Sequence, residues 1–169
     1  KEKTWEDKKL DKLLLYHIHY FDYINFDYNE KYNSRNIKLI YEWIKYKKNI
    51  KFVGFEPYPV SLRIVNWIKW SIENSYYEIF FLDTILSEAN YLSKRIEWHI
   101  LGNHLFKNAK ALIFAGIYFN NPIAKKFYSS GIKIIKKQIK NQILEDGGHF
   151  ERSPMYHAIF LEDLLDIVN

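Results

Sequence analysis

Cysteine is absent from the chain, and its absence excludes several kinds of site. Without a thiol the protein can form no disulfide framework, no cysteine nucleophile and no thiolate metal site. Long hydrophobic runs are missing too, and none reaches the roughly 18 residues that a membrane-spanning helix needs. No signal peptide is visible at the start of the chain. We therefore expect no membrane span in this segment, and the sequence leaves the compartment open.

Apolar and aromatic residues are abundant. Hydrophobic residues make up 48% of the 169 residues and aromatic residues 18%, which is enough for a sizeable core and too much for a disordered chain. The length suits one domain or a piece of a larger one. The chain opens on Lys1 without an initiator methionine and ends on Asn169 inside a helical pattern. We expect both ends to be cut from a longer protein.

Charge is distributed unevenly along the chain. The formal net charge is +5, yet residues 145–169 hold six carboxylates against Arg152 alone, so the remainder is clearly basic. A basic surface favours an anionic polymer, either a nucleic acid or an acidic polysaccharide, although lysines on outer helix faces produce the same pattern. The basic residues are scattered and no recognition motif is present. We therefore expect no nucleic-acid partner and keep the acidic polysaccharide.

Apolar residues recur at helical spacing over most of the chain. We expect helices over residues 6–15, 37–48, 61–74, 76–92, 98–118, 122–144 and 154–168. Residues 16–23 are aromatic and partly alternating, which predicts a strand-like or irregular segment. Ser61 is expected to cap the third helix, and Pro122 and Pro154 stand at first helical positions. Helices with short links pack as antiparallel hairpins, so the predicted class is all-α.

A first polar cluster interrupts this pattern at Arg95-Ile-Glu-Trp-His-Ile-Leu-Gly-Asn-His104. Arg95, His99 and Asn103 are four residues apart and would share one face of a helix, with His104 pointing about 100° away. Gly102 would let another backbone or a ligand come close. From spacing alone, Asn103 and His104 are equally well explained as buried residues that tie helices together through hydrogen bonds.

A second polar cluster, Asp146-Gly-Gly-His-Phe-Glu-Arg-Ser-Pro-Met-Tyr-His157, is the most informative part of the chain. Ser153 can cap a helix that starts at Pro154, which places Tyr156 in its first turn. A tyrosine in that position can give a proton to, or take one from, a sugar oxygen or carbon. The alternative is a structural tyrosine whose hydroxyl binds a neighbouring carbonyl, an ordinary role in a chain with 14 tyrosines.

Metal binding and hydrolysis are less well supported by the sequence. Two sets of residues could hold a metal, but neither has a familiar zinc spacing: His149, Glu151 and His157, or His17 and His19. We expect no metal and no cofactor. Ser153 lacks a nucleophile elbow. Paired carboxylates are the better rival, because Asp146, Glu151 or Glu162 could serve an inverting glycoside hydrolase.

A third group lies on the helix expected from Ser61. Arg63, Asn66 and Trp67 fall on one face of that helix, together with Trp70. Such a face can stack on sugars and bind an anion. It can equally be a buried arginine network beneath tryptophans, and both interpretations stay open at this point.

These segments resemble the helical domain of the heparinase II/III-like polysaccharide lyases. The matching segments follow in order along nearly the whole chain: residues 16–23, 57–67, 97–105, 108–112 and 146–157. The resemblance is strongest to bacterial members linked to surface-polysaccharide clusters. It implies that residues 1–169 form one domain, part of an incomplete α/α toroid. It also implies a C-terminal β-sandwich domain that is absent from this chain, and a periplasmic or secreted location.

The resemblance also implies a reaction, β-elimination on a uronate-containing polysaccharide. A side chain neutralises the C5 carboxylate, a base removes the C5 proton, and an acid protonates the departing O4. Asn103 matches the neutralising residue of the family, and Tyr156 matches the acid and, on some substrates, the base. His104 matches the base of related alginate lyases, whereas heparinase-type members use a histidine of the β-sandwich. The remaining candidates are substrate contacts: Arg63, Asn66, Trp67, His99, His149, Glu151, Arg152 and His157.

The leading hypothesis from the sequence is therefore a lyase domain that acts on an acidic polysaccharide. The isolated segment is expected to be inactive, since it lacks the β-domain. Two alternatives remain. One is an α/α-toroid glycoside hydrolase, and the other is a polysaccharide-binding or assembly module without turnover.

Overall fold

The structure is a computed structural model that describes residues 5–7, 9–26, 30–47, 53–100 and 102–169. Within these ranges every regular element is a helix, and the only β pairing is an isolated bridge between Ile143 and His149. The predicted all-α class is confirmed, while the toroid stays a prediction. None of the described helices is both long and apolar enough to cross a membrane. The chain divides into two compact units, residues 1–88 and 89–169.

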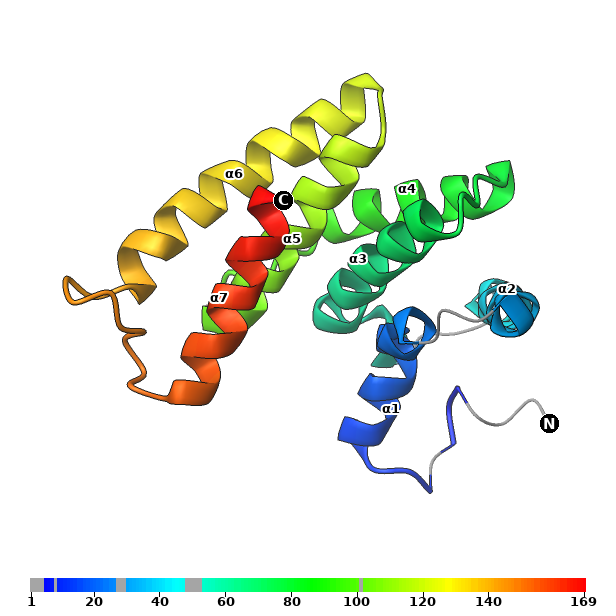
Figure 1. Cartoon of the computed structure of the whole chain (residues 1–169), viewed down its shortest axis with the longest axis horizontal. Coiled ribbons are helices and arrows are strands. Elements are labelled where there is room, and N and C mark those ends of the chain that lie inside the picture. The colour runs from blue at the N-terminus through cyan, green and yellow to red at the C-terminus, as the bar shows by residue number, and fades with distance from the viewer. Residues whose placement is uncertain (1–4, 8, 27–29, 48–52, 101) are drawn as a thin grey trace. The chain divides into compact units, whose positions relative to one another are not determined.

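The first unit is built from helices around an aromatic core. In chain order (Figure 1) its elements are α1 (Lys12–Tyr20), η1 (Asp22–Asn25), α2 (Glu30–Tyr46), η3 (Val53–Phe55), α3 (Pro57–Glu73) and the first part of α4 (Ile79–Ser93). The rings of Trp43 and Trp67 meet edge to face with centroids 5.5 Å apart, and neither side chain is exposed. Edge-to-face contact is a favoured geometry for aromatic pairs.

The start of α1 corrects two predictions. The helix begins at Lys12 rather than near residue 6, because the side chain of Asp11 accepts a hydrogen bond from the Leu14 N–H at 2.9 Å and caps it there. It then runs through Tyr20 and is followed by η1, so the expectation of a strand-like or irregular segment over residues 16–23 was wrong. Phe21, with a φ of 59°, ends the helix in the left-handed region.

Helix α3 starts earlier than the sequence predicted. We expected Ser61 to cap this helix, but the helix begins at Pro57 and Ser61 lies inside it. The Ser61 hydroxyl donates to the carbonyl of Pro57 at 2.7 Å, a bond that a serine within a helix can make. Pro57 and Pro59 both fall in the first turn, where a missing N–H costs no intrahelical bond.

The second unit is formed by the end of α4 and by α5 (Gly102–Tyr118), α6 (Pro122–Gln142) and α7 (Pro154–Val168). Helices α5 and α6 form an antiparallel hairpin, and α7 packs against α5 (Figure 1). Gly131 allows the close approach of α6 to α5, because a Cβ there would lie 2.6 Å from Ile113 Cγ1 and 2.8 Å from the Ala109 carbonyl. The rings of Phe106 and Phe160 join α5 to α7 with centroids 4.3 Å apart.

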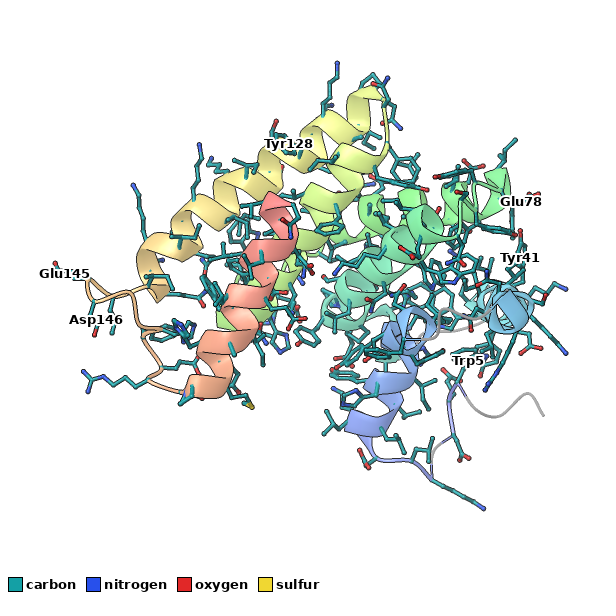
Figure 2. All side chains as sticks on the ribbon, in the orientation of Figure 1. Trp5, Tyr41, Glu78, Tyr128, Glu145 and Asp146 are labelled. Atoms are coloured by element: carbon teal, nitrogen blue, oxygen red, sulfur yellow. The ribbon has the colours of Figure 1, made fainter. Side chains whose placement is uncertain are left out.

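Both proline-marked helix starts are confirmed. The side chain of Asn121 accepts from the Ala124 N–H at 2.9 Å, and the side chain of Ser153 accepts from the Tyr156 N–H at 3.4 Å. Residues 143–153 form the loop predicted between α6 and α7, and Glu145 and Asp146 project from its tip (Figure 2).

Buried ion pairs also hold α7 to α5. Asp163 is almost wholly buried, and one of its carboxylate oxygens lies 2.7 Å from both Lys107 Nζ and Lys110 Nζ. Lys110 pairs with Asp166 as well. Pairing of this kind compensates for removing charged groups from water, and it fixes the position of α7 along α5.

Candidate active site

The three predicted catalytic residues lie in the first turns of two helices of the second unit. Asn103 and His104 are the second and third residues of α5, and Tyr156 is the third residue of α7. Backbone N–H groups in a first turn lack intrahelical partners, and the helix dipole is positive there, so both positions favour an anion. All three side chains are half-buried, as partly accessible functional groups must be.

Two hydrogen bonds and a ring contact join these two helix starts. The side-chain amide of Gln142, at the end of α6, donates to the Gly102 carbonyl at 3.4 Å, and its oxygen lies 3.1 Å from His149 Nε2. The His149 ring in turn stacks on Tyr156, with centroids 6.5 Å apart and an interplanar angle of 29°. The last residue of α6 thus connects the residue before Asn103 with the predicted catalytic tyrosine.

His149 forms the buried centre of this path. Its side chain is only 5% exposed and also contacts the Phe160 ring at a centroid distance of 5.4 Å. The Glu151 N–H donates to Nδ1 at 3.4 Å, and this contact assigns the proton of the neutral ring to Nε2, which then donates to the Gln142 oxygen. Both ring nitrogens are engaged by the protein itself. A direct substrate contact by His149 stays a prediction; the structure shows that its ring packs against Tyr156.

His104 is held by Glu97 and, through it, by Asn108. The Nδ1 atom of His104 lies 3.2 Å from Glu97 Oε1, and the Asn108 side-chain amide donates to Glu97 Oε2 at 3.2 Å. The Glu97 N–H donates back to Asn108 Oδ1 at 2.9 Å. Glu97 is 6% exposed and Asn108 is fully buried. These bonds attach the segment before α5 to the helix itself.

Helix α5 is shorter at its start than the helix expected over residues 98–118. Residues 98–100 form a turn, and the helix is described from Gly102, so Arg95, His99 and Asn103 do not share one helix face. That prediction was wrong. Gly102 has a φ of 50°, in the left-handed region that glycine adopts readily. His99 is exposed in the turn before α5.

The other predicted contacts of the second cluster are accessible. Glu151, Arg152 and His157 are all exposed and flank Tyr156 in the chain. Asp146, a candidate for a glycosidase pair, accepts a hydrogen bond from the Gly148 N–H at 2.8 Å at the loop tip (Figure 2). Among the described residues, no three histidine, aspartate or glutamate side chains are grouped so that they could hold a metal ion.

Arg63, Asn66 and Trp67 belong to the first unit, where Arg63 and Trp67 have no exposed surface. The Arg63 guanidinium lies 4.0 Å from the Trp43 ring centroid. Its three nitrogens donate to Glu88 Oε2 at 2.9 Å, to the His19 carbonyl at 3.1 Å and to the Gly54 carbonyl at 3.0 Å. This arrangement matches the buried arginine network that the sequence left as an alternative. A substrate contact by these residues stays a prediction.

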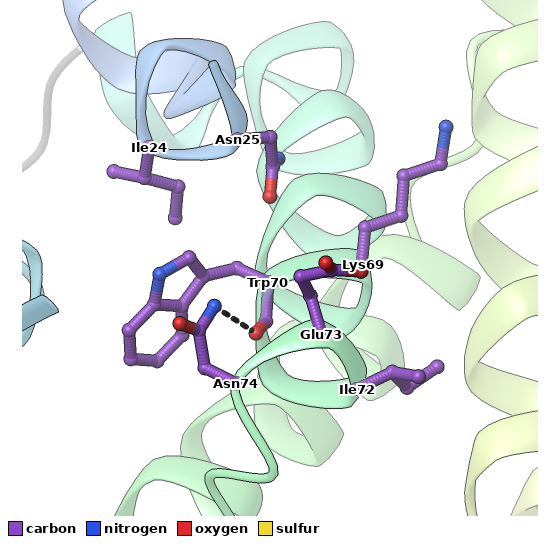
Figure 3. Close-up of a pocket in the computed structure, with 7 residues that line it drawn as sticks. All are labelled: Ile24, Asn25, Lys69, Trp70, Ile72, Glu73 and Asn74. Atoms are coloured by element: carbon purple, nitrogen blue, oxygen red, sulfur yellow. Dashed lines mark hydrogen bonds between the residues drawn. The ribbon is translucent and has the colours of Figure 1, made fainter. Parts of the chain in front are cut away.

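The first unit also contains a hollow of about 560 Å³ beside the end of α3 (Figure 3). Its amide side chains already bind the protein's own backbone. Asn25 donates to the Asn66 carbonyl at 3.2 Å, and Asn74 donates to the Trp70 carbonyl at 2.9 Å. Trp70 is 1% exposed, so its ring offers no face for stacking. We place no functional site there.

Comparison with known proteins decides the family. Residues 62–169 match the family described as Heparinase II/III N-terminus. The chain belongs to this family. The resemblance inferred from the motifs is therefore confirmed, and the matched range includes both polar clusters of the candidate site. No solved structure matches the chain.

Three curated relatives of this heparinase II/III family chain carry the name heparin-sulfate lyase. The Pedobacter heparinus protein is 33% identical over 86 residues, which are 50% of this chain and 13% of that protein. The Bacteroides stercoris protein is 42% identical over 57 residues, 33% of this chain and 9% of that protein. The Bacteroides thetaiotaomicron protein is 37% identical over 68 residues, 38% of this chain and 9% of that protein. The match spans only about a tenth of the length of these relatives.

Sequence reasoning missed Glu97 and Gln142 as parts of the site. Neither has a local signature, because the partners of Glu97 lie seven and eleven residues away and those of Gln142 include Gly102, forty residues away. Glu97 stands inside a matching family segment, which was the one available signal.

Proposed function

We propose that this chain is the helical part of a polysaccharide lyase that cleaves a uronate-containing acidic polysaccharide by β-elimination. The observation that carries the proposal is the path from Gly102 through Gln142 and His149 to Tyr156. It joins the helix starts that bear Asn103 and Tyr156. Membership in the heparinase II/III family and the names of the three relatives support lyase chemistry and a polysaccharide substrate.

Asn103 has the properties needed to bind the C5 carboxylate of a uronate. Its amide donates hydrogen bonds while remaining neutral, and the first turn of α5 favours an anion. A carboxylate bound in this way draws electron density from C5, so the C5 proton becomes easier to remove. This effect is largest in the transition state, where charge develops on the carboxylate.

Two proton transfers then complete the reaction. The base can be His104, as in the related alginate lyases, or a histidine of the β-sandwich domain, as in heparinase-type members; we propose His104, because Glu97 holds its ring in place. In the proposal, Nε2 of His104 takes the proton from C5, the C4–O4 bond breaks as a C4–C5 double bond forms, and the Tyr156 hydroxyl gives its proton to O4. Exposed side chains around these groups supply further substrate contacts: His99, Glu151, Arg152 and His157. The proposal includes the incomplete α/α toroid and a β-sandwich domain that completes the site.

The proposal is tested by incubating the full-length protein with a panel of uronate polymers. Absorbance of the 4,5-unsaturated uronate should rise with at least one polymer. Asn103→Ala and Tyr156→Phe should each lower that rate by at least about 100-fold, the usual contribution of a positioned proton donor or oxyanion donor. Binding of the polymers without any cleavage would contradict a lyase and support a binding module.

A further inference from the structure

Glu97 does more than attach a loop to α5. Its carboxylate is shared between two side chains of that helix, with Oε1 at 3.2 Å from His104 Nδ1 and Oε2 at 3.2 Å from the Asn108 amide. Only 6% of Glu97 is exposed, so both contacts form away from bulk water. Hydrogen bonds to an ionised group are stronger in such a buried place than in water.

The chemistry of these contacts determines which nitrogen of His104 carries the proton. An ionised carboxylate only accepts hydrogen bonds, so Nδ1 of a neutral His104 ring must be the donor. The ring lone pair is then on Nε2. We infer that Glu97 is a positioning residue that holds His104 in the Nδ1–H tautomer and makes Nε2 its proton-accepting atom. The tautomer follows from the contacts alone, and its use in catalysis rests on the proposed function.

Asn108 makes this assignment rigid. The Glu97 N–H donates to Asn108 Oδ1 at 2.9 Å, so the Asn108 amide nitrogen must be the group that faces the Glu97 carboxylate. An acceptor is therefore required at the Oε2 position of residue 97. Asn108 is fully buried, and reversing its amide would set its NH₂ group against the Glu97 N–H and its oxygen against the Glu97 carboxylate.

Glu97→Gln provides a sharp test because of this constraint. The glutamine oxygen must face the Asn108 amide, so the glutamine NH₂ group must face His104 Nδ1. Nδ1 then has to accept, and the proton moves to Nε2, which can no longer take a proton from the substrate. Glu97→Asp keeps a carboxylate and should retain the original tautomer. Glu145→Gln, which replaces an exposed carboxylate of the α6–α7 loop, is the matched control.

The experiment reads the His104 ring nitrogens by ¹⁵N NMR in the intact protein, at a pH where the ring is neutral. Wild type, Glu97→Asp and Glu145→Gln should show the Nδ1–H form, and Glu97→Gln should show the Nε2–H form. A wild-type ring in the Nε2–H form, or a Glu97→Gln ring still in the Nδ1–H form, would overturn the inference.

Kinetics on the full-length protein then separate the inference from the proposed function. Glu97→Gln should lower kcat by about 10²–10⁴-fold with little change in KM, as expected when a general base is held in the wrong tautomer. A tautomer switch with unchanged kcat would overturn the catalytic part of the inference. If the ring switches as expected but the wild-type protein forms no unsaturated product, the proposed function fails while the role of Glu97 in setting the tautomer stands.

Discussion

The ring centroids of His149 and Tyr156 lie 6.5 Å apart with an angle of 29° between the ring planes, and Nε2 of the same histidine lies 3.1 Å from Gln142 Oε1. One buried side chain therefore connects the predicted catalytic tyrosine with the end of α6. The substrate contact expected of His149 from the sequence stays a prediction. Its observed contacts with Gln142 and Tyr156 predict that it also helps to position the tyrosine.

Replacing His149 should lower the stability of the folded protein. His149→Leu leaves the buried Gln142 oxygen without its donor, and an unsatisfied buried polar group costs about 1–3 kcal/mol of unfolding free energy. Urea denaturation measures this change. His157→Leu removes a histidine from an exposed position close by and should change stability by less than about 0.5 kcal/mol. Equal effects of the two substitutions would contradict the role given to His149.

Acid should destabilise the first unit through His19. Burial lowers the pKa of His19 to about 3, and the charge of Arg63 acts in the same direction. The Trp43 indole N–H donates to Nδ1 at 3.0 Å, and Nε2 lies 3.0 Å from the Trp5 carbonyl, so the neutral ring satisfies both partners. A proton added to Nδ1 would face another donor.

The sign of the pH effect follows from this lowered pKa. The unfolded chain, with a histidine pKa of about 6.5, binds the proton more readily than the folded chain. The stability contributed by neutral His19 is therefore complete above about pH 6.5 and is lost as the pH falls towards 3, by up to about 1.4 kcal/mol per pH unit. Unfolding free energies measured across this range should show a smaller loss in His19→Gln than in wild type. His17→Gln, on the exposed side of α1, should retain the wild-type loss.

Arg63 should be essential for folding of the first unit. Arg63→Leu leaves the Glu88 carboxylate buried without its closest cation, and breaking a buried pair in this way costs about 3–5 kcal/mol. Arg63→Lys should also be destabilising, since one ammonium group cannot replace three separate donors and a stacked guanidinium. Thermal and urea unfolding measure the loss of stability in both variants. Arg35→Leu, at an exposed site on α2, is the control. A stable Arg63→Leu protein with only a raised KM would instead support substrate binding.

The α5–α6 hairpin should not tolerate a side chain at residue 131. A Cβ there would meet Ile113 Cγ1 at 2.6 Å and the Ala109 carbonyl at 2.8 Å, so the helices would have to separate. Overpacking of this kind costs about 1–3 kcal/mol, which exceeds the gain of up to about 1 kcal/mol in helix propensity from glycine to alanine. Ser130→Ala changes the neighbouring, exposed position and should be nearly neutral in urea unfolding.

The sequence predicted the start of a helix correctly where the capping residue and a proline are neighbours in the chain. Ser153-Pro154 and Asn121-Pro122 marked two helix starts correctly, because the capping side chain and the proline are neighbours in the chain. Ser61 misled, because a serine can also bond to a carbonyl one turn earlier within a helix. The start of α5 was misplaced for another reason. Contacts of Glu97 with Asn108, eleven residues away, hold the preceding turn outside the helix.

The candidate site was predicted in part. Two polar clusters and the family resemblance led to Asn103, His104 and Tyr156, whose catalytic roles stay predictions; the structure places all three in first turns of helices. It did not reveal Gln142 or Glu97 as supporting residues. Side chains that support a site act through contacts between distant segments, and the spacing within one segment carries no record of such contacts.

The central claim, that the protein breaks its substrate by β-elimination, is tested most directly by the chemistry of the new chain ends. Both a lyase and a hydrolase create a reducing end with each bond they cleave, but only a lyase also creates a 4,5-unsaturated uronate. Products of the full-length protein should therefore contain one unsaturated uronate for every new reducing end, and Tyr156→Phe should suppress both together. New reducing ends without unsaturated uronate would contradict the account and indicate hydrolysis.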